Sequence, residues 1–294
     1  MHVEWIRQYL GHQAAVYAIL PDHSTGEEFL SAGGEGWIAR WQKGSEDGRL
    51  VGKADTSLFT LARLEHQLVV GGLDARLYLI DEVNNQVRAI ENHRKGIYRL
   101  VTKGNRLISL GADGKLTQWD AQSWLPEFSL QITHQPLRSY AWLDEERLWV
   151  GSSDGNLYLT DLHQGKILHQ IAAHEPSVFS LVFDPVNNRL ISGGRDAQIK
   201  QWDARSGQPI KIVPAHWYTV NDLILHPSHP ILASASRDRT IKLWDPDTLE
   251  LIKVIETPKF PGHIRSVNAL AWLDEQTLLS GGDDRSIMEW RILL

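Results

Sequence analysis

The chain has 294 residues, which is seven times 42, and 42% of them are hydrophobic and 22% charged. This composition is typical of a folded globular protein, and 23 Gly and 12 Pro exclude collagen-like and linker-like chains. The net charge of −6 argues against a general phosphate-binding surface, and no apolar run reaches the roughly 18 residues that a bilayer span needs. Zero Cys excludes disulfides, Cys-ligated zinc, iron–sulfur clusters and a Cys nucleophile.

The first ten residues alternate between apolar and polar side chains. They lack a basic region followed by an apolar core, which is the pattern of a signal peptide. The alternation predicts a strand in residues 1–10. Because the signal-peptide pattern is missing, the protein is expected to be cytoplasmic.

A strand–turn–strand pattern then recurs along the chain. Three copies end in Trp-Asp, at Trp119, Trp202 and Trp244, and the other four end at positions 41, 80, 160 and 290, so that successive ends differ by 39 to 46 residues. Six positions before each end lies an acidic residue: Glu35, Asp74, Asp113, Asp154, Asp196, Asp238 and Asp284. Seven matches at one offset indicate seven copies of one structural unit.

A second signature, a His at the start of a strand, precedes these acidic turns. It occurs at His12, His93, His134, His174, His216 and His263, and Asp55 takes its place in the second repeat. The segments between the signatures read as short strands separated by turns, without sustained helical periodicity. Each repeat is thus predicted to hold four short strands.

The Gly-His pairs at 11–12 and 262–263, together with the Trp-Asp pairs, resemble the WD-repeat (WD40) family over the whole chain. The resemblance implies an all-β fold, a single seven-bladed β-propeller over residues 1–294 with four-stranded antiparallel blades. In this family the Trp-Asp strand is the third of its blade. The chain ends four residues after Trp290, so residues 1–10 are expected to supply the missing strand of the last blade and close the ring.

A Ser before each acidic turn completes a four-residue set in five repeats. The sets are His12, Ser31, Glu35 and Trp41; His93, Ser109, Asp113 and Trp119; His174, Ser192, Asp196 and Trp202; His216, Ser234, Asp238 and Trp244; and His263, Ser280, Asp284 and Trp290. The resemblance implies that each set is a buried hydrogen-bond network. Ser, His and Asp also form hydrolase triads, but a triad is needed once and includes no Trp. No catalytic residue is therefore assigned.

Repeats two and four lack both Ser and Trp. The corresponding residues are Asp55, Val70, Asp74 and Ile80 in repeat two, and His134, Val150, Asp154 and Thr160 in repeat four. We expect apolar packing to replace the network there, with the turn Asp capping its own backbone amides.

The remaining His residues give no metal-binding spacing. His226 and His229 lie in a Pro-bracketed turn, and His163 and His169 flank another, without a third ligand nearby. They are predicted to be solvated turn or strand residues. Neither a P-loop nor a GxGxxG turn is present, so no metal and no cofactor is expected.

In the WD40 family partners often bind the top face of the ring, where three positions per blade point. The fifth residues after the His signature are Tyr17, Phe59 (assuming a one-residue deletion in repeat two), Tyr98, Ser139, Phe179, Asn221 and Asn268, and the third are Ala15, Ser57, Gly96, Leu137, Ser177, Thr219 and Ser266. The residues before the turn acid are Gly34, Leu73, Ala112, Ser153, Arg195, Arg237 and Asp283. The candidate contacts are Tyr17, Phe59, Leu73, Tyr98, Phe179, Arg195, Asn221, Arg237, Asn268 and Asp283.

Exposed aromatic and Arg side chains are enriched at binding hot spots. They favour a non-catalytic scaffold that binds a peptide or protein loop with an apolar anchor and an acidic group. The aromatics could instead only fill the mouth of the channel. An enzyme, a hydrolase or lyase acting at that mouth, is the alternative function. A nucleic-acid partner is disfavoured by the net charge, no membrane contact is expected, and the propeller is predicted to be monomeric.

Overall fold

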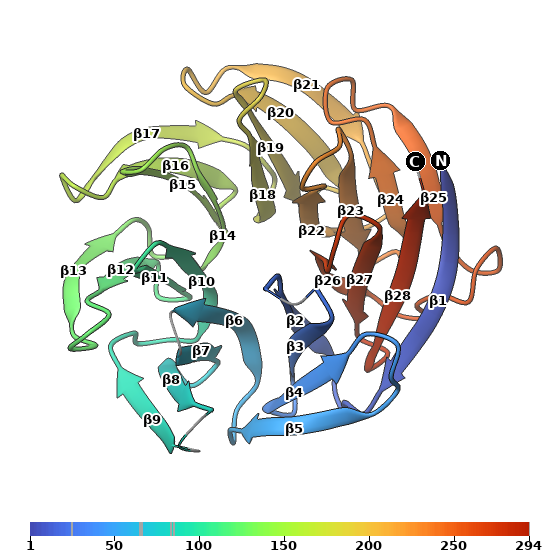
Figure 1. Ribbon diagram of the computed structural model, residues 1–294. Helices are drawn as coiled ribbons and strands as arrows, with labels where there is room; N and C mark the ends of the chain where they lie inside the picture. The colour runs from blue at the N-terminus through green and yellow to red at the C-terminus, as the bar shows by residue number, and fades with distance from the viewer. Residues whose placement is uncertain (25, 65–66, 83, 85, 294) are drawn as a thin grey trace.

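The computed structural model describes residues 1–24, 26–64, 67–82, 84 and 86–293. The described residues form 28 strands in seven four-stranded antiparallel sheets, which Figure 1 shows as blades around a central axis. The predicted all-β, seven-bladed fold is confirmed. Within the described part of the chain, no helix has the length and apolar character that a membrane span would require.

The first four blades each consist of four consecutive strands. Blade one is β2 (Val16–Asp22), β3 (Glu28–Gly33), β4 (Trp37–Gln42) and β5 (Gly48–Lys53), and blade two is β6 (Leu58–Leu64), β7 (Gln67–Gly72), β8 (Arg76–Asp81) and β9 (Gln86–Glu91). Blade three is β10 (Ile97–Lys103), β11 (Arg106–Gly111), β12 (Lys115–Trp119) and β13 (Pro126–Gln131), and blade four is β14 (Leu137–Trp142), β15 (Arg147–Ser152), β16 (Asn156–Asp161) and β17 (Lys166–Ala172).

The last three blades include the one that joins both ends of the chain. Blade five is β18 (Val178–Asp184), β19 (Arg189–Gly194), β20 (Gln198–Asp203) and β21 (Pro209–Pro214), and blade six is β22 (Val220–Leu225), β23 (Leu232–Ser236), β24 (Ile241–Trp244) and β25 (Leu251–Ile255). Blade seven is β26 (Val267–Trp272), β27 (Thr277–Gly282), β28 (Ser286–Leu293) and β1 (His2–Leu10).

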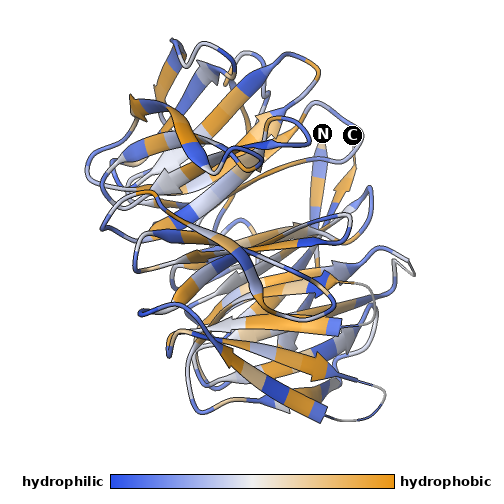
Figure 2. Ribbon diagram, turned by 90° about the vertical axis from the view of Figure 1, so that its left-hand side faces the viewer, coloured by the Kyte–Doolittle hydropathy of each residue, from blue (hydrophilic) through white to orange (hydrophobic). Residues whose placement is uncertain are grey.

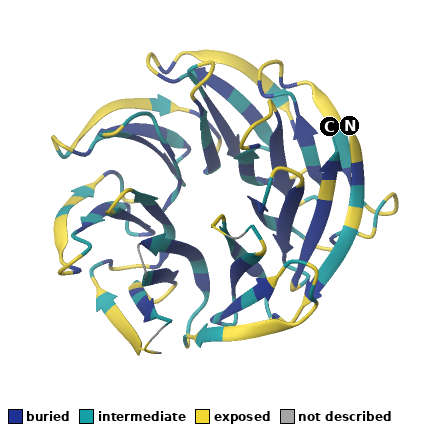
Figure 3. Cartoon of the chain, in the orientation of Figure 1, coloured by how far each residue is buried: buried dark blue, intermediate teal, exposed yellow. Residues whose placement is uncertain are grey.

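Burial falls from the middle of each blade to its rim. Figure 3 shows the middle strands mostly buried and the outermost strands mostly exposed. All five residues of β23 are buried, whereas six of the seven residues of β17 are exposed. Figure 2 shows hydrophobic stretches along many strands, and consecutive residues of the second strand of a blade are buried, as residues 68–72 of β7 are, because a blade packs between two neighbours.

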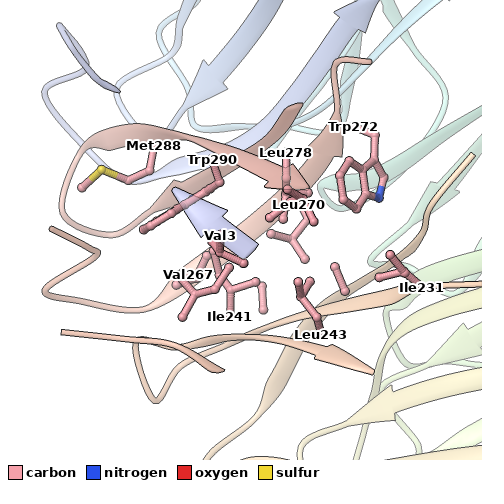
Figure 4. Close-up of a cluster of buried hydrophobic side chains, with 14 residues drawn as sticks. Val3, Ile231, Ile241, Leu243, Val267, Leu270, Trp272, Leu278, Met288 and Trp290 are labelled. Atoms are coloured by element: carbon pink, nitrogen blue, oxygen red, sulfur yellow. The ribbon is translucent and has the colours of Figure 1, made fainter. Parts of the chain in front are cut away.

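The ring is closed by the first and last strands, as predicted. β1 pairs antiparallel with β28, with Val3 opposite Ile292 and Leu10 opposite Ser286, and the termini lie side by side in Figure 1. Val3 is buried in a cluster that joins blades six and seven and includes Leu243 and Trp290 (Figure 4). The closing strand therefore contributes backbone pairing and packing to the same interface.

A left-handed residue follows the turn acid in every blade. Three of these residues are Gly and four are not: Gly36, Ala75, Gly114, Gly155, Ala197, Arg239 and Arg285. At Gly114, with φ +77°, an added Cβ would lie 1.9 Å from the carbonyl oxygen of Thr133, so only Gly fits. This turn presents the preceding acidic residue to the loop that enters the innermost strand.

Candidate functional site

The five predicted four-residue sets form hydrogen-bond networks. In blade five, His174 Nε2 lies 2.7 Å from Ser192 Oγ, His174 Nδ1 lies 2.8 Å from Asp196, and the Trp202 indole N–H donates to Ser192 Oγ at 2.9 Å. A carboxylate can only accept, so Nδ1 carries the proton and the Ser192 hydroxyl donates to Nε2. Blades one, three, six and seven repeat this arrangement, with Glu35 as the acid in blade one.

These networks have the donor order of a hydrolase triad but no access for a substrate. All five Ser side chains, Ser192 among them, are fully buried. The indole N–H of Trp202 occupies the serine oxygen that would attack a substrate. The networks therefore satisfy buried polar groups between strands, which stabilises each blade.

The networks hold their carboxylates in the charged form. Burial alone would raise the pKa of Asp113, but the hydrogen bond from His93 and the amide N–H of Arg94 outweigh it and bring the pKa to about 2. The pKa values of Asp196 and Asp284 are also lowered. Burial alone would raise them, but the hydrogen bonds from His174 and His263 outweigh it.

Blades two and four replace the network by a Tyr. The hydroxyl of Tyr78 donates to Asp74 at 2.5 Å, and that of Tyr158 donates to Asp154 at 2.7 Å. Val70 and Val150, at the Ser positions, are fully buried in hydrophobic clusters. The predicted apolar packing is thus confirmed, and the two Tyr residues, each four positions after the acid, were missed.

The turn acids of these two blades also cap their own turns. Asp74 accepts the amide N–H of Arg76 at 3.3 Å, and Asp154 accepts that of Asn156 at 3.0 Å. The predicted capping role is confirmed.

The signature position in these blades was assigned one residue too late. Asp55 and His134 are exposed. The bulges at Phe59 and Arg138 lie five residues after Ala54 and Thr133, as the bulge at Phe179 lies five residues after His174. Thr133 also donates its hydroxyl to Asp154 at 2.8 Å. With Ala54 and Thr133 in register, repeat two contains no deletion, and the top-face positions of blade four shift by one residue.

The fifth position after this corrected signature is a β-bulge in every blade. The strand pairing skips one residue there, and the skipped residues are Tyr17, Phe59, Tyr98, Arg138, Phe179, Asn221 and Asn268. The prediction of Ser139 was wrong, because Ser139 is buried and Arg138 takes the place. These seven residues, with Arg99, line a pocket of about 220 Å³ at the mouth of the channel.

The third-position residues lie beside the acidic turns. The amide of the residue before each acid donates to their carbonyl oxygens, as Arg195 does to Ser177 at 2.9 Å and Arg237 to Thr219 at 3.1 Å. In blade four the partner is Pro136, whereas the predicted Leu137 is fully buried in the core. We call the end of the ring formed by these loops and turns the top face.

Four aromatic side chains and one Arg run along five blades of the pocket. The rings of Tyr17 and Phe59 are 5.0 Å apart and those of Phe59 and Tyr98 5.1 Å apart. Arg138 continues the row, with its guanidinium 4.8 Å from the Tyr98 ring and 4.7 Å from the Phe179 ring. We call these five residues the aromatic row; each is half-buried, so each keeps a surface that a ligand can contact.

The other two blades present amides. Asn221 donates to Ser266 Oγ at 2.9 Å and to the Val267 carbonyl at 2.8 Å. Asn268 donates to Asp283 at 2.7 Å. Asn268 and Asp283 thus satisfy one another, and the mouth of the channel is apolar and cationic on one side and amide-lined on the other.

The outer top face carries exposed side chains, some of them not predicted. Leu73 is 50% exposed, and Arg195 and Arg237 are exposed without an ion pair to any residue that the structure describes. Trp217 is 86% exposed and Ile264 is 69% exposed. Each follows the His of its signature, so its position in the repeat could have identified it.

The channel below the mouth has a volume of about 570 Å³ and is lined in part by a half-buried acid, Asp222. Asp222 accepts the Leu270 amide at 2.9 Å and the Ser180 hydroxyl at 3.1 Å, and it lies 3.9 Å from Arg99. Burial raises its pKa, and Arg99 opposes the rise. Asp222 follows the bulge of β22 and links the innermost strands of blades five, six and seven, a role that its sequence did not indicate.

His226 was wrongly predicted to be solvated. It is buried against the Trp272 ring, with centroids 4.5 Å apart, its Nε2 donates to the Glu275 carbonyl at 2.8 Å, and its Nδ1 accepts the amides of Ser228 and His229. Burial lowers the pKa of His226. Within the described ranges, no group of three or more His, Asp or Glu side chains could hold a metal ion.

The repeats themselves match a known family. The sequence model of the WD domain, G-beta repeat, matches residues 165–203, 207–245 and 254–291, each running from the outer strand of one blade to the third strand of the next. The chain carries WD40 repeats. Over 98 residues it is 31% identical to the WD repeat-containing protein VIP3 of Arabidopsis thaliana, an alignment that covers 29% of this chain and only 30% of that protein.

The architecture also matches a solved WD40 structure. The WD40 β-propeller domain of Doa1 superposes with a TM-score of 0.87 over 99% of this chain and 97% of that domain, at 18% identity. This likeness concerns the fold. WD40 propellers generally serve as scaffolds for protein interactions.

Proposed function

We propose that this WD40 propeller is a non-catalytic scaffold that binds a peptide or a protein loop across the mouth of its channel. The aromatic row carries the proposal. Five large side chains line one side of a pocket of about 220 Å³ and keep part of their surface open. Partly exposed aromatic and Arg side chains around a concave surface are the usual centre of a binding site.

The surroundings of the row favour a peptide with an acidic group. Gly34 lies next to the Tyr17 ring and Ala15 lies next to Gly34, and both are small, so a ligand backbone can come close to this ring. Arg195 and Arg237 lie in the acidic turns of blades five and six, without an acidic partner among the described residues. A carboxylate or phosphate on the ligand would form charge-assisted hydrogen bonds with them.

The alternative, an enzyme in the channel, has weaker support. Asp222 is the carboxylate that the structure places there, and its oxygens already accept two backbone amides and the Ser180 hydroxyl. Those contacts hold strands together, which suits a structural role. The cytoplasmic location and the monomeric state stay predictions.

Selection from a random peptide display library, using the full chain as bait, tests the proposal. We expect the wild-type chain to enrich sequences that combine an apolar residue with acidic ones. The double substitution Arg195→Glu and Arg237→Glu should abolish this enrichment without changing the melting temperature, because both side chains are exposed. Arg205→Glu is the matched control, since Arg205 is an exposed Arg in the turn between β20 and β21, away from the top face.

Two results would contradict the proposal. One is the enrichment of the same peptides by the wild-type chain and by the Arg195→Glu, Arg237→Glu variant. The other is enrichment that the Arg205→Glu control abolishes, which would place the binding surface on the opposite face.

A further inference from the structure

Arg138 is a half-buried cation without an acidic partner among the described residues. Its guanidinium lies between the rings of Tyr98 and Phe179, and its Nε–H donates to the Ser153 hydroxyl. None of the carboxylates in the described part of the chain comes within ion-pair distance of it. Buried charges in proteins are ordinarily paired, because an unpaired charge in a low-dielectric site is costly.

Two further Arg residues act on the same site. Burial lowers the pKa of Arg138, and the charges of Arg99 and Arg195 lower it further, whereas Tyr98 opposes the change. The nearest acid to Arg99 is Asp222 at 3.9 Å, whose oxygens are already engaged with the innermost strands. Three positive charges therefore act on the mouth of the channel, where Arg99 and Arg138 line the pocket.

We propose that this part of the pocket is an anion subsite, which receives a carboxylate or a phosphate ester next to an apolar group of the ligand. This inference rests on the proposed function and names the ligand chemistry of its centre. Arg138 would supply the guanidinium N–H groups left free by its hydrogen bonds to Ser153 and Tyr98, and Arg195 would reach the anion from the turn above. Tyr98 and Phe179 would contact the apolar group.

A purely structural role for Arg138 leads to different expectations. If Arg138 only fills the space between two rings, its cation–π contacts are sufficient. Anions would then bind no better than neutral molecules of the same shape. An aromatic cage for cations would be occupied by ammonium groups, which Arg99, Arg138 and Arg195 would repel. The sign of the ligand charge therefore separates the three roles.

Four probes with the same benzene ring test the subsite: phenyl phosphate, phenylacetate, benzyl alcohol and benzylamine. Saturation-transfer NMR and calorimetric titration with the full chain at low ionic strength measure their binding. We expect both anions to bind, and benzyl alcohol and benzylamine to bind at least about tenfold more weakly. A preference for phenyl phosphate over phenylacetate would identify a phosphorylated group as the ligand, and the reverse order a carboxylate.

The variants Arg138→Gln and Arg195→Gln connect the binding to the proposed residues. Each should weaken phenyl phosphate binding by about tenfold, the loss of one charge-assisted hydrogen bond, whereas Arg205→Gln should leave it unchanged. Because Arg195 is exposed, its variant stays informative even where Arg138→Gln unfolds the chain. Equal binding of all four probes, stronger binding of benzylamine, or anion binding that survives both substitutions would overturn the subsite.

The two proposals can fail separately. If peptides are selected on the top face but none of the anionic probes binds, the scaffold stands and the anion subsite falls. If the anions bind as expected but no peptide is selected, the anion subsite stands and the proposal of a peptide or protein-loop ligand falls.

Discussion

The hydroxyl of Tyr9 donates a hydrogen bond of 2.6 Å to the carboxylate of Glu289, which joins the first strand of the chain to the last. Both side chains are buried: Tyr9 is 1% exposed and Glu289 is 4% exposed. Burial and then Glu289 raise the pKa of Tyr9 well above its ordinary value, so the hydroxyl keeps its proton in the folded state. The ring is thus closed by a buried polar contact as well as by strand pairing.

Removing the Tyr9 hydroxyl should destabilise the whole propeller. Tyr9→Phe leaves the buried Glu289 carboxylate without this donor, and we expect a loss of about 2–3 kcal/mol in the free energy of unfolding. Urea denaturation followed by Trp fluorescence measures the loss. Tyr218→Phe is the control, because Tyr218 is 61% exposed, and equal midpoints for the two variants would contradict a lock at Tyr9.

Deleting residues 1–10 should abolish cooperative unfolding. The deletion unpairs β28, exposes its edge and removes Val3 and Tyr9 from two hydrophobic clusters. A thermal melt followed by circular dichroism is expected to lose its sharp transition. A synthetic peptide of residues 1–10 should restore the transition and a scrambled peptide should not, whereas a truncated chain with the wild-type melting curve would refute the closure.

The hydrogen-bond networks predict that opposite substitutions destabilise the two kinds of blade. Ser192→Ala strands the Trp202 N–H and His174 Nε2, and should cost about 1–3 kcal/mol. Val70→Ser should cost a similar amount, because blade two offers its hydroxyl neither Trp nor His, and Val70 is fully buried. Urea midpoints measure both, with the exposed Ser228→Ala as the control. A stabilising Val70→Ser would show that blade two can rebuild the network.

The turn after the acid predicts two substitutions with opposite effects on stability. Gly114→Ala should destabilise by more than about 2 kcal/mol, because its Cβ would meet the Thr133 carbonyl. Ala197 adopts φ +63° at the equivalent position, so Ala197→Gly should stabilise by up to about 1 kcal/mol. Differential scanning calorimetry measures both shifts in melting temperature. Shifts of the same sign would show that the turn does not set the energy of this position.

The fold could be predicted because the turns and strands of each repeat lie at fixed distances from one another in the sequence. The acid marks the turn, and the residue six positions later marks the end of the following strand, as Asp196 and Trp202 do. The same offsets located the residues of the five sets, and the resemblance to the WD40 family implied that each set is a buried network. Both levels of structure are local to one repeat, and seven copies reinforce each other.

The errors came where a position is defined by the backbone. In blades two and four the signature was sought as a polar side chain, at Asp55 and His134, whereas the β-bulge five residues later places Ala54 and Thr133 at this position. Any residue can occupy such a backbone position, so the sequence carried no signal. The one-residue shift hid Arg138, the central residue of the proposed anion subsite. Its lack of an acidic partner depends on the arrangement of several blades and could not be read from one repeat.

The network carboxylates predict how stability depends on pH. Asp113 has a pKa of about 2 in the folded protein against an ordinary value of 3.8. A lowered carboxylate pKa contributes stability above pH 4, and this contribution is lost as the pH falls from about 4 to 2. Asp113→Asn should therefore cost up to about 2 kcal/mol at pH 7 and much less near pH 2. Urea midpoints across this range measure the difference, with the exposed Asp55→Asn as the control, and a cost that stays constant with pH would show that the charge of Asp113 does not stabilise blade three.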